Sequence, residues 1–376
     1  TTTQITVLET ADLAKLNTSH IQALSTSAIA NLTIDQFKAL STDQLNALTT
    51  GQVKGLTTAQ LVALTTDQAG GLSTGIVSAL TAVQLSAVAT DDFSTLSTEA
   101  LAALTTSQIS ALTTAQVVAL SEDQAGVLTT AQVKALTSTQ ISVFETADLA
   151  KLSTSHIQAL STNAIAKLTA DQFKALSTDQ LNALTTGQIK GLTTAQLVAL
   201  TTDQVSGLSS TVVSALTTSQ LAAVATNQVA ALSTAQIVAL STLQASKLST
   251  DQAAALTTAQ VQSIEAADVV KLSTSAVSAL STQQVKALTT DQLTAFTSAQ
   301  NAALTSDQVG VMSTPQLAAL LSGMQMTSTT TAQVAALSTS QIGALSTLQA
   351  SQLSSDQVGV LNTAQITAIT TTNVAK

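Results

Sequence analysis

Apolar residues recur at two fixed places in every eight residues of the chain. In the stretch LTTAQVVALSEDQAGVLTTAQVKAL (112–136), leucine returns every eighth residue, and Val or Ala follows five residues after each leucine that starts a complete octad. We number the octad from its leucine. Position 2 is Ser or Thr, position 3 usually Thr, position 5 Gln, position 6 Val, Ile or Leu, and position 8 Ala or Gly. The frame is unbroken from Leu8 to Leu320 and defines a tandem-repeat array.

Nearly every octad carries the signals of a helix start. Positions 2 to 5 read Ser/Thr-x-x-Gln, a capping box in which the hydroxyl accepts the backbone N–H three residues on and the glutamine reaches back. Positions 1 and 6 then form a hydrophobic staple. Ser, Thr or Asn fills 41 of 47 second positions, the exceptions being Glu9, Ala89, Glu145, Ala225, Glu265 and Leu321. The pattern predicts a new helix of about one and a half turns in each octad.

Charged residues are sorted along the octad as a helix dipole favours. All 21 acidic residues lie at positions 2 to 5, and all 12 lysines lie at positions 7 or 8. Each such placement contributes roughly 0.3–1 kcal/mol in a helix, whereas a strand has little net dipole. We therefore predict an all-α solenoid of very short helices built from 8-residue repeats. A β-solenoid is the alternative, because Thr and Val favour strands.

Stacking must supply the stability of these helices, because an isolated helix of this length is unstable in water. We expect positions 1, 6 and 8 to form the buried face. All five phenylalanines lie at position 1 or 6, namely Phe37, Phe93, Phe144, Phe173 and Phe296. Polar residues or Gly recur at position 8 every two or three octads, which predicts between two and three octads per coil.

One extra residue interrupts the frame in LLSGMQMTS (320–328). We expect a single elongated domain, with a continuous octad solenoid over 1–320, the frame slip over 321–328, and the solenoid continuing over 329–376. Residues 9–68 and 145–204 differ at five of 60 positions, so the array grew by copying blocks of octads.

Composition argues against several classes of function. The chain has no cysteine for disulfides or thiolate metal sites, and its net charge of −9 comes without a basic cluster for nucleic acid. No apolar run is long enough to cross a membrane. There is no Gly-rich phosphate loop, no GxSxG and no credible catalytic triad. We expect no enzymatic activity and no cofactor.

Two groups of ionisable residues are candidates for a site. His20 and His156 occupy position 5 in copies of TSHIQAL, where a metal-binding or catalytic role competes with a capping role. Carboxylates three residues apart could hold calcium, although the helix dipole already accounts for them. These pairs are Glu9/Asp12, Glu145/Asp148 and Glu265/Asp268. The structural interpretation is favoured for both groups, and we expect no catalytic, cofactor-binding or metal site.

The Thr-Thr pairs at positions 2 and 3 form a regular lattice of hydroxyl groups. Such a lattice suits an ice-binding face or an O-glycosylated stalk. We favour the simpler interpretation, in which position 2 is used for capping and position 3 is a solvated first-turn residue.

The octads LTTAQVVA (112–119) and LSTAQIVA (232–239) resemble the tandem LTTAQ repeats of very large bacterial exoproteins, which are labelled adhesin-like or haem-utilisation proteins. The resemblance covers essentially the whole chain and implies the stalk-like part of such a protein. No haem-ligand motif accompanies it. We expect a structural repeat protein at the bacterial cell surface or outside the cell, forming a rod, stalk or head-to-tail filament. The alternative is a module that binds glycans, ice or another surface through its Thr-rich face.

The first and last octads look like interior units rather than polar caps. We therefore expect either continuation of a longer array or end-to-end self-association, a heterologous contact that does not close. We expect neither nucleic-acid binding nor membrane insertion.

Overall fold

A computed structural model describes residues 2–322 and 326–373, and almost every octad in them forms one short α-helix. Most helices are four to six residues long, the exceptions being α40 with nine and α45 with eleven. No residue in these two ranges lies in a strand. The all-α solenoid is thereby confirmed, and the β-solenoid alternative is unsupported. Within the same ranges, no helix has the length and apolar character needed to cross a membrane.

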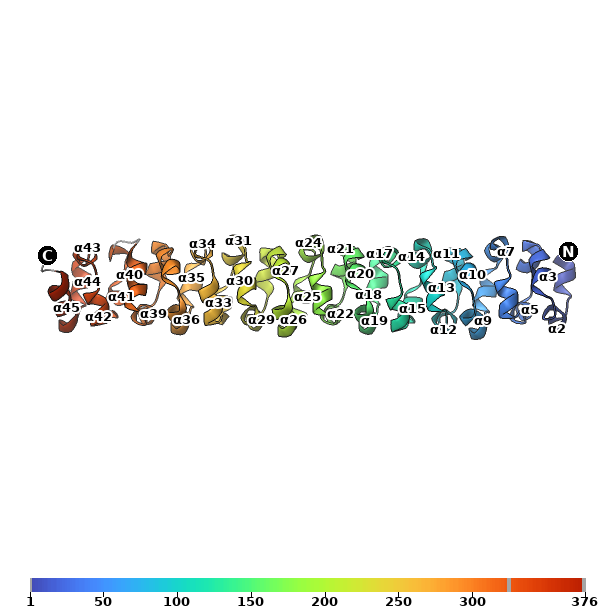
Figure 1. Ribbon diagram of the computed structural model, residues 1–376, viewed down its shortest axis with the longest axis horizontal. Helices are drawn as coiled ribbons and strands as arrows, with labels where there is room; N and C mark the ends of the chain where they lie inside the picture. The colour runs from blue at the N-terminus through green and yellow to red at the C-terminus, as the bar shows by residue number, and fades with distance from the viewer. Residues whose placement is uncertain (1, 323–325, 374–376) are drawn as a thin grey trace. The chain divides into compact units, whose positions relative to one another are not determined.

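Contacts divide the chain into two compact units, residues 1–192 and 193–376, and each is described by itself. The first unit is drawn from blue to green in Figure 1. Its helices are α1 (Thr2–Thr6), α2 (Thr10–Leu13), α3 (Thr18–Ala23), α4 (Thr26–Ala30), α5 (Ile34–Lys38), α6 (Thr42–Asn46), α7 (Thr50–Gly55), α8 (Thr58–Val62), α9 (Thr66–Gly70), α10 (Thr74–Ala79), α11 (Ala82–Ala87), α12 (Thr90–Ser94), α13 (Thr98–Ala102), α14 (Thr106–Ala111), α15 (Thr114–Val118), α16 (Glu122–Gly126), α17 (Thr130–Ala135), α18 (Ser138–Ser142), α19 (Thr146–Lys151), α20 (Thr154–Ala159), α21 (Thr162–Lys167), α22 (Ala170–Lys174), α23 (Thr178–Asn182) and α24 (Thr186–Lys190).

The second unit repeats the same construction and also contains a short 3-10 helix, η1. Its helices are α25 (Thr194–Ala199), α26 (Thr202–Gly207), α27 (Ser210–Ala215), α28 (Thr218–Ala223), α29 (Thr226–Ala231), α30 (Thr234–Val238), α31 (Thr242–Ala245), α32 (Thr250–Ala255), α33 (Thr258–Ser263), α34 (Ala266–Val269), α35 (Thr274–Ser278), α36 (Thr282–Ala287), α37 (Thr290–Thr294), α38 (Ser298–Ala303), α39 (Ser306–Gly310), α40 (Thr314–Ser322), η1 (Met326–Ser328), α41 (Thr331–Ala335), α42 (Thr339–Gly343), α43 (Thr347–Ser351), α44 (Ser355–Gly359) and α45 (Thr363–Asn373).

The backbone explains why the period is eight. Leu112 ends α14 in an extended conformation (φ −55°, ψ 137°), and Thr113 continues extended as the N-cap of α15 (φ −69°, ψ 156°). The Thr113 hydroxyl accepts the Gln116 N–H at 3.1 Å, and the Gln116 Oε1 accepts the Thr113 N–H at 3.0 Å. Two extended residues therefore turn the chain and about six residues complete the helix, as the predicted capping box requires.

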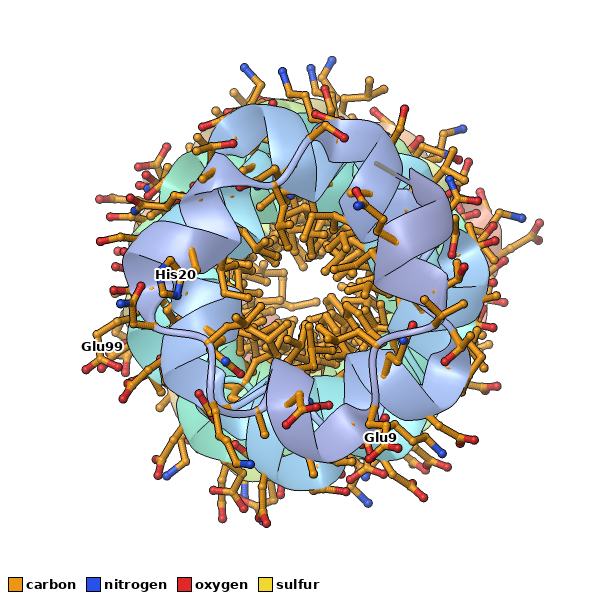
Figure 2. All side chains as sticks on the ribbon, turned by 90° about the vertical axis from the view of Figure 1, so that its right-hand side faces the viewer. Glu9, His20 and Glu99 are labelled. Atoms are coloured by element: carbon orange, nitrogen blue, oxygen red, sulfur yellow. The ribbon has the colours of Figure 1, made fainter. Side chains whose placement is uncertain are left out.

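Positions 1, 5 and 6 form the buried face, which corrects part of the prediction. Position 8 is mostly half-exposed rather than buried, as Ala103 and Ala119 illustrate. Position 5 is buried in its place, and its occupant is usually glutamine, as at Gln116 and Gln132. Viewed from the N-terminal end of the chain, carbon-only side chains converge inside the ring of helices, while most of the nitrogen and oxygen atoms lie farther out (Figure 2). Glutamine tolerates burial because its amide is fully used in hydrogen bonds.

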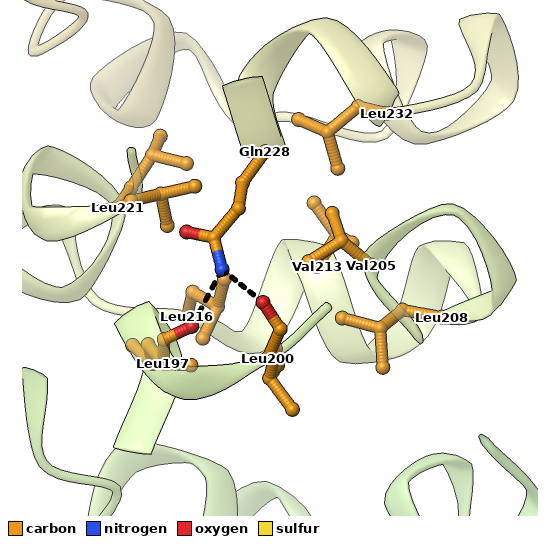
Figure 3. A pocket seen from close by; sticks show the side chains of 10 residues that line it. Leu197, Leu200, Val205, Leu208, Val213, Leu216, Leu221, Gln228 and Leu232 are labelled. Carbon is orange, nitrogen blue, oxygen red and sulfur yellow. Dashed lines mark hydrogen bonds between the residues drawn. The ribbon is translucent and has the colours of Figure 1, made fainter. Parts of the chain in front are cut away.

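The buried glutamine amides connect successive coils of the solenoid. Gln228 shows the arrangement in Figure 3: its Nε2 donates to the Leu197 and Leu200 carbonyls at 3.0 and 2.7 Å. Its Oε1 accepts the Ala225 N–H of its own helix at 3.0 Å. The same pattern recurs along both units, so one side chain caps its own helix and bridges to the coil before it.

The bridges also give the length of a coil. The two carbonyls that receive each amide lie 31 and 28 residues earlier in the chain, as for Gln132 with Leu101 and Leu104. One coil therefore takes between three and four octads, and the predicted two to three is wrong. Position 8 misled because it is half-exposed or fully exposed in every described octad and is never buried, so its polar residues carry no coil period.

Most of the bridges persist across the frame slip. The predicted slip over 321–328 coincides with the longer helix α40 and with η1; residues 323–325 lie outside the described residues. Beyond it, Gln333 still donates to the carbonyls of positions 6 and 1, Asn301 and Leu304, now 32 and 29 residues earlier. The extra residue is thus taken up within one coil.

Replacing the amide donor alone should weaken the solenoid. Gln228→Glu keeps an oxygen for the Ala225 N–H but removes the N–H donors facing Leu197 and Leu200. We expect the unfolding free energy of the second unit to fall by about 2–4 kcal/mol, because two buried carbonyls lose their partner. Chemical denaturation at pH 7 measures the change.

Gln349→Glu is the matched control. The Gln349 Oε1 accepts the Ser346 N–H at 2.9 Å, but its Nε2 donates to no carbonyl of the described residues. Its effect should stay below about 1 kcal/mol. Equal losses in both variants would contradict the bridging role.

Candidate functional site

A small enclosed cavity in the second unit offers no binding chemistry. It lies between successive coils, is lined by aliphatic side chains such as Leu208 and Leu221, and has a volume of about 20 Å³ (Figure 3). Gln228 is the only polar lining residue, and its amide is engaged in the bridge. An apolar space of this size holds at most about one water molecule and stays dry. The cavity is a packing defect of the core.

The two histidines lie in different surroundings despite their nearly identical sequence context. His156 is 8% exposed, and its Nδ1 accepts the Ser153 N–H at 3.2 Å, as a capping-box glutamine would. Burial lowers the pKa of His156, so the ring is held neutral. His20 is exposed at the N-terminal edge of the first unit (Figure 2), where its backbone N–H is capped by Asn17. The predicted capping role therefore describes His156.

The carboxylate pairs also differ in burial. Asp12 is exposed and forms an ion pair with Lys15 at 3.3 Å, whereas Asp148 is 2% exposed and its Oδ2 has no hydrogen-bond partner. Burial raises the pKa of Asp148 to about 6. The nearby Glu145 and Glu122 carboxylates add to the rise, and a backbone hydrogen bond at Glu145 opposes it. In the described ranges, no three His, Asp or Glu side chains are grouped so that they could hold a metal ion.

Asp148, His156 and Ala164 occupy three successive fifth positions, so a stretch of the first unit lacks the amide bridge. Helices α19, α20 and α21 pack against α16, α17 and α18 there. No described glutamine donates to the carbonyls that would receive the bridges, at residues 117, 120, 125, 128, 133 and 136. We call this packing of α19–α21 on α16–α18 the glutamine-free contact.

Apolar packing and one ion pair hold the glutamine-free contact. Val117, Ala125 and Val133 on the earlier coil are fully buried. Across it, the Lys151 Nζ lies 3.1 Å from the Glu122 Oε2, with both side chains about half exposed. The contact is therefore a place where coils stack with fewer hydrogen bonds than where the glutamine bridge is present, and it contains the most strongly shifted carboxyl group among the described residues.

The structure agrees with the simpler interpretation of the Thr-Thr pairs, in which position 2 caps the helix and position 3 is solvated. Hydroxyls at position 2 are used for capping, as at Thr113 and Thr129. Position 3 hydroxyls such as those of Thr114 and Thr130 are exposed. Most described octads thus present one small polar group to solvent at position 3, on the outside of the coil.

Two further buried polar groups lie next to the frame slip. Asn301 replaces the aliphatic residue of position 6 and Thr329 the leucine of position 1, and neither side chain has a hydrogen-bond partner. Their positions in the octad are enough to identify both as polar residues at places that are otherwise apolar and buried.

These features define a tandem-repeat α-solenoid in which the recurring polar side chains cap the helices and link successive coils. The ALTTAQ repeat family profile matches residues 5–42, 37–74, 47–82, 85–122, 141–178, 174–210 and 261–298. Together these segments cover more than half of the chain, and the chain belongs to this family.

Other comparisons add little. No curated protein matches the chain. Among solved structures, the leucine-rich repeat-containing protein LegL7 from Legionella pneumophila is 14% identical, with 83% of this chain and 78% of that chain covered and a TM-score of 0.11. That likeness is too low to carry an argument about fold or function.

The buried carboxyl group makes the glutamine-free contact sensitive to pH. The pKa of Asp148 is about 6 in the folded chain against 3.8 ordinarily, so its ionised form opposes folding. This penalty is absent below pH 3.8, grows as pH rises and is complete above pH 6. We expect Asp148→Asn to stabilise α19 by about 1–3 kcal/mol at pH 7.5 and by much less at pH 4.5, measured by native-state hydrogen exchange.

Asp12→Asn provides the control, because Asp12 has the same sequence neighbours but is exposed. Its helix α2 should change by less than about 0.5 kcal/mol at either pH. A stabilisation of α19 that is the same at both pH values would show that the Asp148 charge is not responsible.

Proposed function

We propose that this structural repeat protein serves as a mechanical spacer, a rod or stalk at the bacterial cell surface or in an extracellular filament. Its contribution is length and stiffness. The contacts between successive coils would provide this stiffness. A partner bound at one end of the solenoid would then be held at a distance from the opposite end.

The proposal rests on one observation: the buried glutamine side chain at position 5 donates hydrogen bonds to the preceding coil. Gln116, for example, caps its own helix at Thr113 and donates to the Leu85 and Val88 carbonyls of the coil before it, at 2.9 Å each. Each added octad therefore adds the same set of contacts, and the array can be lengthened by duplication without new chemistry. The copied blocks 9–68 and 145–204 are consistent with such growth.

The outer surface also suits a spacer outside the cell. It presents hydroxyls at most third positions, with most of the acidic residues and the lysines placed at opposite ends of the short helices. The absence of cysteine leaves no thiol to oxidise in such a compartment. The resemblance of the octads to those of large bacterial exoproteins supports the same location.

A binding module remains the second candidate, because the exposed position 3 hydroxyls form a repeating surface. Glycan arrays and thermal-hysteresis assays with the purified chain separate the two functions. A signal in either assay would favour the binding module over the spacer.

Small-angle X-ray scattering of the dilute monomer tests the spacer directly. A compact chain of 376 residues would have a radius of gyration of about 21 Å. We expect a value at least roughly twice as large, because coils that contact only their neighbours along the chain extend the particle. A radius near that of a compact globule would contradict the spacer function.

A further inference from the structure

Aspartate takes the place of the bridging glutamine in four octads, at Asp12, Asp92, Asp148 and Asp268. Asp92 shows what a buried aspartate at position 5 can do. It is 7% exposed, and its Oδ1 accepts a hydrogen bond of 3.1 Å from the hydroxyl of Thr66, on helix α9 of the preceding coil. A carboxyl group at position 5 therefore reaches the preceding coil, as a glutamine amide does.

Asp148 meets a carboxylate where Asp92 meets a hydroxyl. Thr66 stands 26 residues before Asp92, and the residue 26 positions before Asp148 is Glu122. Glu122 is the only one of the 21 acidic residues of the chain at position 3 of its octad. Its helix, α16, packs against α19, and the buried Oδ2 of Asp148 has no hydrogen-bond partner. The donor that serves Asp92 is thus missing at Asp148.

The register of the coils places acceptors opposite Asp148. Position 5 amides donate to carbonyls 31 and 28 residues earlier, as Gln116 does to Leu85 and Val88. For Asp148 the corresponding carbonyls belong to Val117 and Leu120, and no described glutamine donates to either. An ionised carboxylate has no hydrogen to donate, so these two carbonyls lack the side-chain donor that their counterparts have.

We propose that Asp148 is an acid-dependent bridge in the glutamine-free contact: its protonated carboxyl group donates its O–H to the Val117 or Leu120 carbonyl, as the amide does in other octads. The proton comes from solvent, and the backbone hydrogen bond at Glu145 is kept. A carboxylic acid has one O–H and serves one carbonyl, where an amide serves two. The contact thus gains one hydrogen bond in acid and loses it when Asp148 ionises.

The surroundings of Asp148 favour its protonated form. Burial raises the pKa of Asp148 to about 6, and the Glu145 and Glu122 carboxylates add to the rise. The Lys151 ammonium lies 3.1 Å from the Glu122 carboxylate. Other titratable or charged residues on the helices packed against α19, or following it in the chain, are Asp123 of α16, Asp171 and Lys174 of α22, and His156 of α20. The bridge should therefore be closed below about pH 5 and open above about pH 7.

This switch belongs to the fold of the first unit and goes beyond the proposed function. Its consequence is local, because α19 should separate from α16 more readily when Asp148 is ionised, while glutamine-bridged contacts keep their hydrogen bonds. The solenoid then holds one contact whose strength depends on pH among contacts whose strength does not.

Carbon-13 NMR of the backbone carbonyls tests the hydrogen bond itself. Between pH 7.5 and 4.5, the Val117 or Leu120 carbonyl resonance should move downfield with the same midpoint as the Asp148 carboxyl carbon, because the new O–H polarises that carbonyl. The Leu85 and Val88 carbonyls, which hold the Gln116 amide at both pH values, are the internal control and should not follow this midpoint. Titration of the carboxyl carbon with both Val117 and Leu120 unmoved would overturn the proposal.

Asp148→Gln supplies a donor at every pH and restores the usual residue of position 5. In the unmodified chain, native-state hydrogen exchange of α19, corrected for intrinsic rates, should show protection at least roughly tenfold greater at pH 4.5 than at pH 7.5. In Asp148→Gln the two pH values should agree within about twofold, because no proton is needed to close the bridge. A pH dependence that persists in Asp148→Gln would assign the effect to other groups and overturn the proposal.

Glu122→Thr is the matched variant on the opposite helix. It gives Asp148 the hydroxyl that Asp92 receives from Thr66 and removes a neighbouring negative charge. The ionised carboxyl group then gains a donor, so the midpoint of the Asp148 titration should fall and the carbonyl response should move to lower pH with it. A carbonyl response that stays at its original pH while the Asp148 midpoint falls would contradict the bridge.

Discussion

The structure depends on one hydrogen-bonding group, the side-chain amide of the glutamine at position 5. Its oxygen closes the capping box of its own helix, and its nitrogen donates to two carbonyls of the preceding coil, as Gln188 does for Ile157 and Leu160. Helices of four to six residues are not stable alone, so this bridge and the aliphatic core must act together.

The sequence predicted the helices more completely than it predicted their stacking. Capping boxes and charge sorting are local signals, and they placed a helix in almost every octad. The size of a coil depends on contacts about 30 residues apart, which no local pattern reports. Position 8 was therefore misjudged as a core position, and Gln was taken for a capping residue alone.

One signal for the bridge was nevertheless present in the sequence. A capping box accepts Glu as readily as Gln at its last position, yet no Glu stands at position 5 anywhere in the chain. Of these two residues at neutral pH, only Gln can both accept from its own N-cap and donate to another coil, because an ionised carboxylate has no donor. The exceptions at Asp148 and His156 mark the glutamine-free contact, whose unusual burial and shifted pKa could not be inferred from residues that look the same in the exposed copy.

The exchange rates of the glutamine side-chain amides test the bridge most directly. Solution NMR of the glutamine-labelled chain should resolve two populations. Position 5 amides such as those of Gln116 and Gln132 are predicted to exchange slowly with solvent, because both carbonyl partners are buried. The exposed amides of Gln22, Gln158 and Gln262 should exchange freely. A single population of freely exchanging amides would contradict the account.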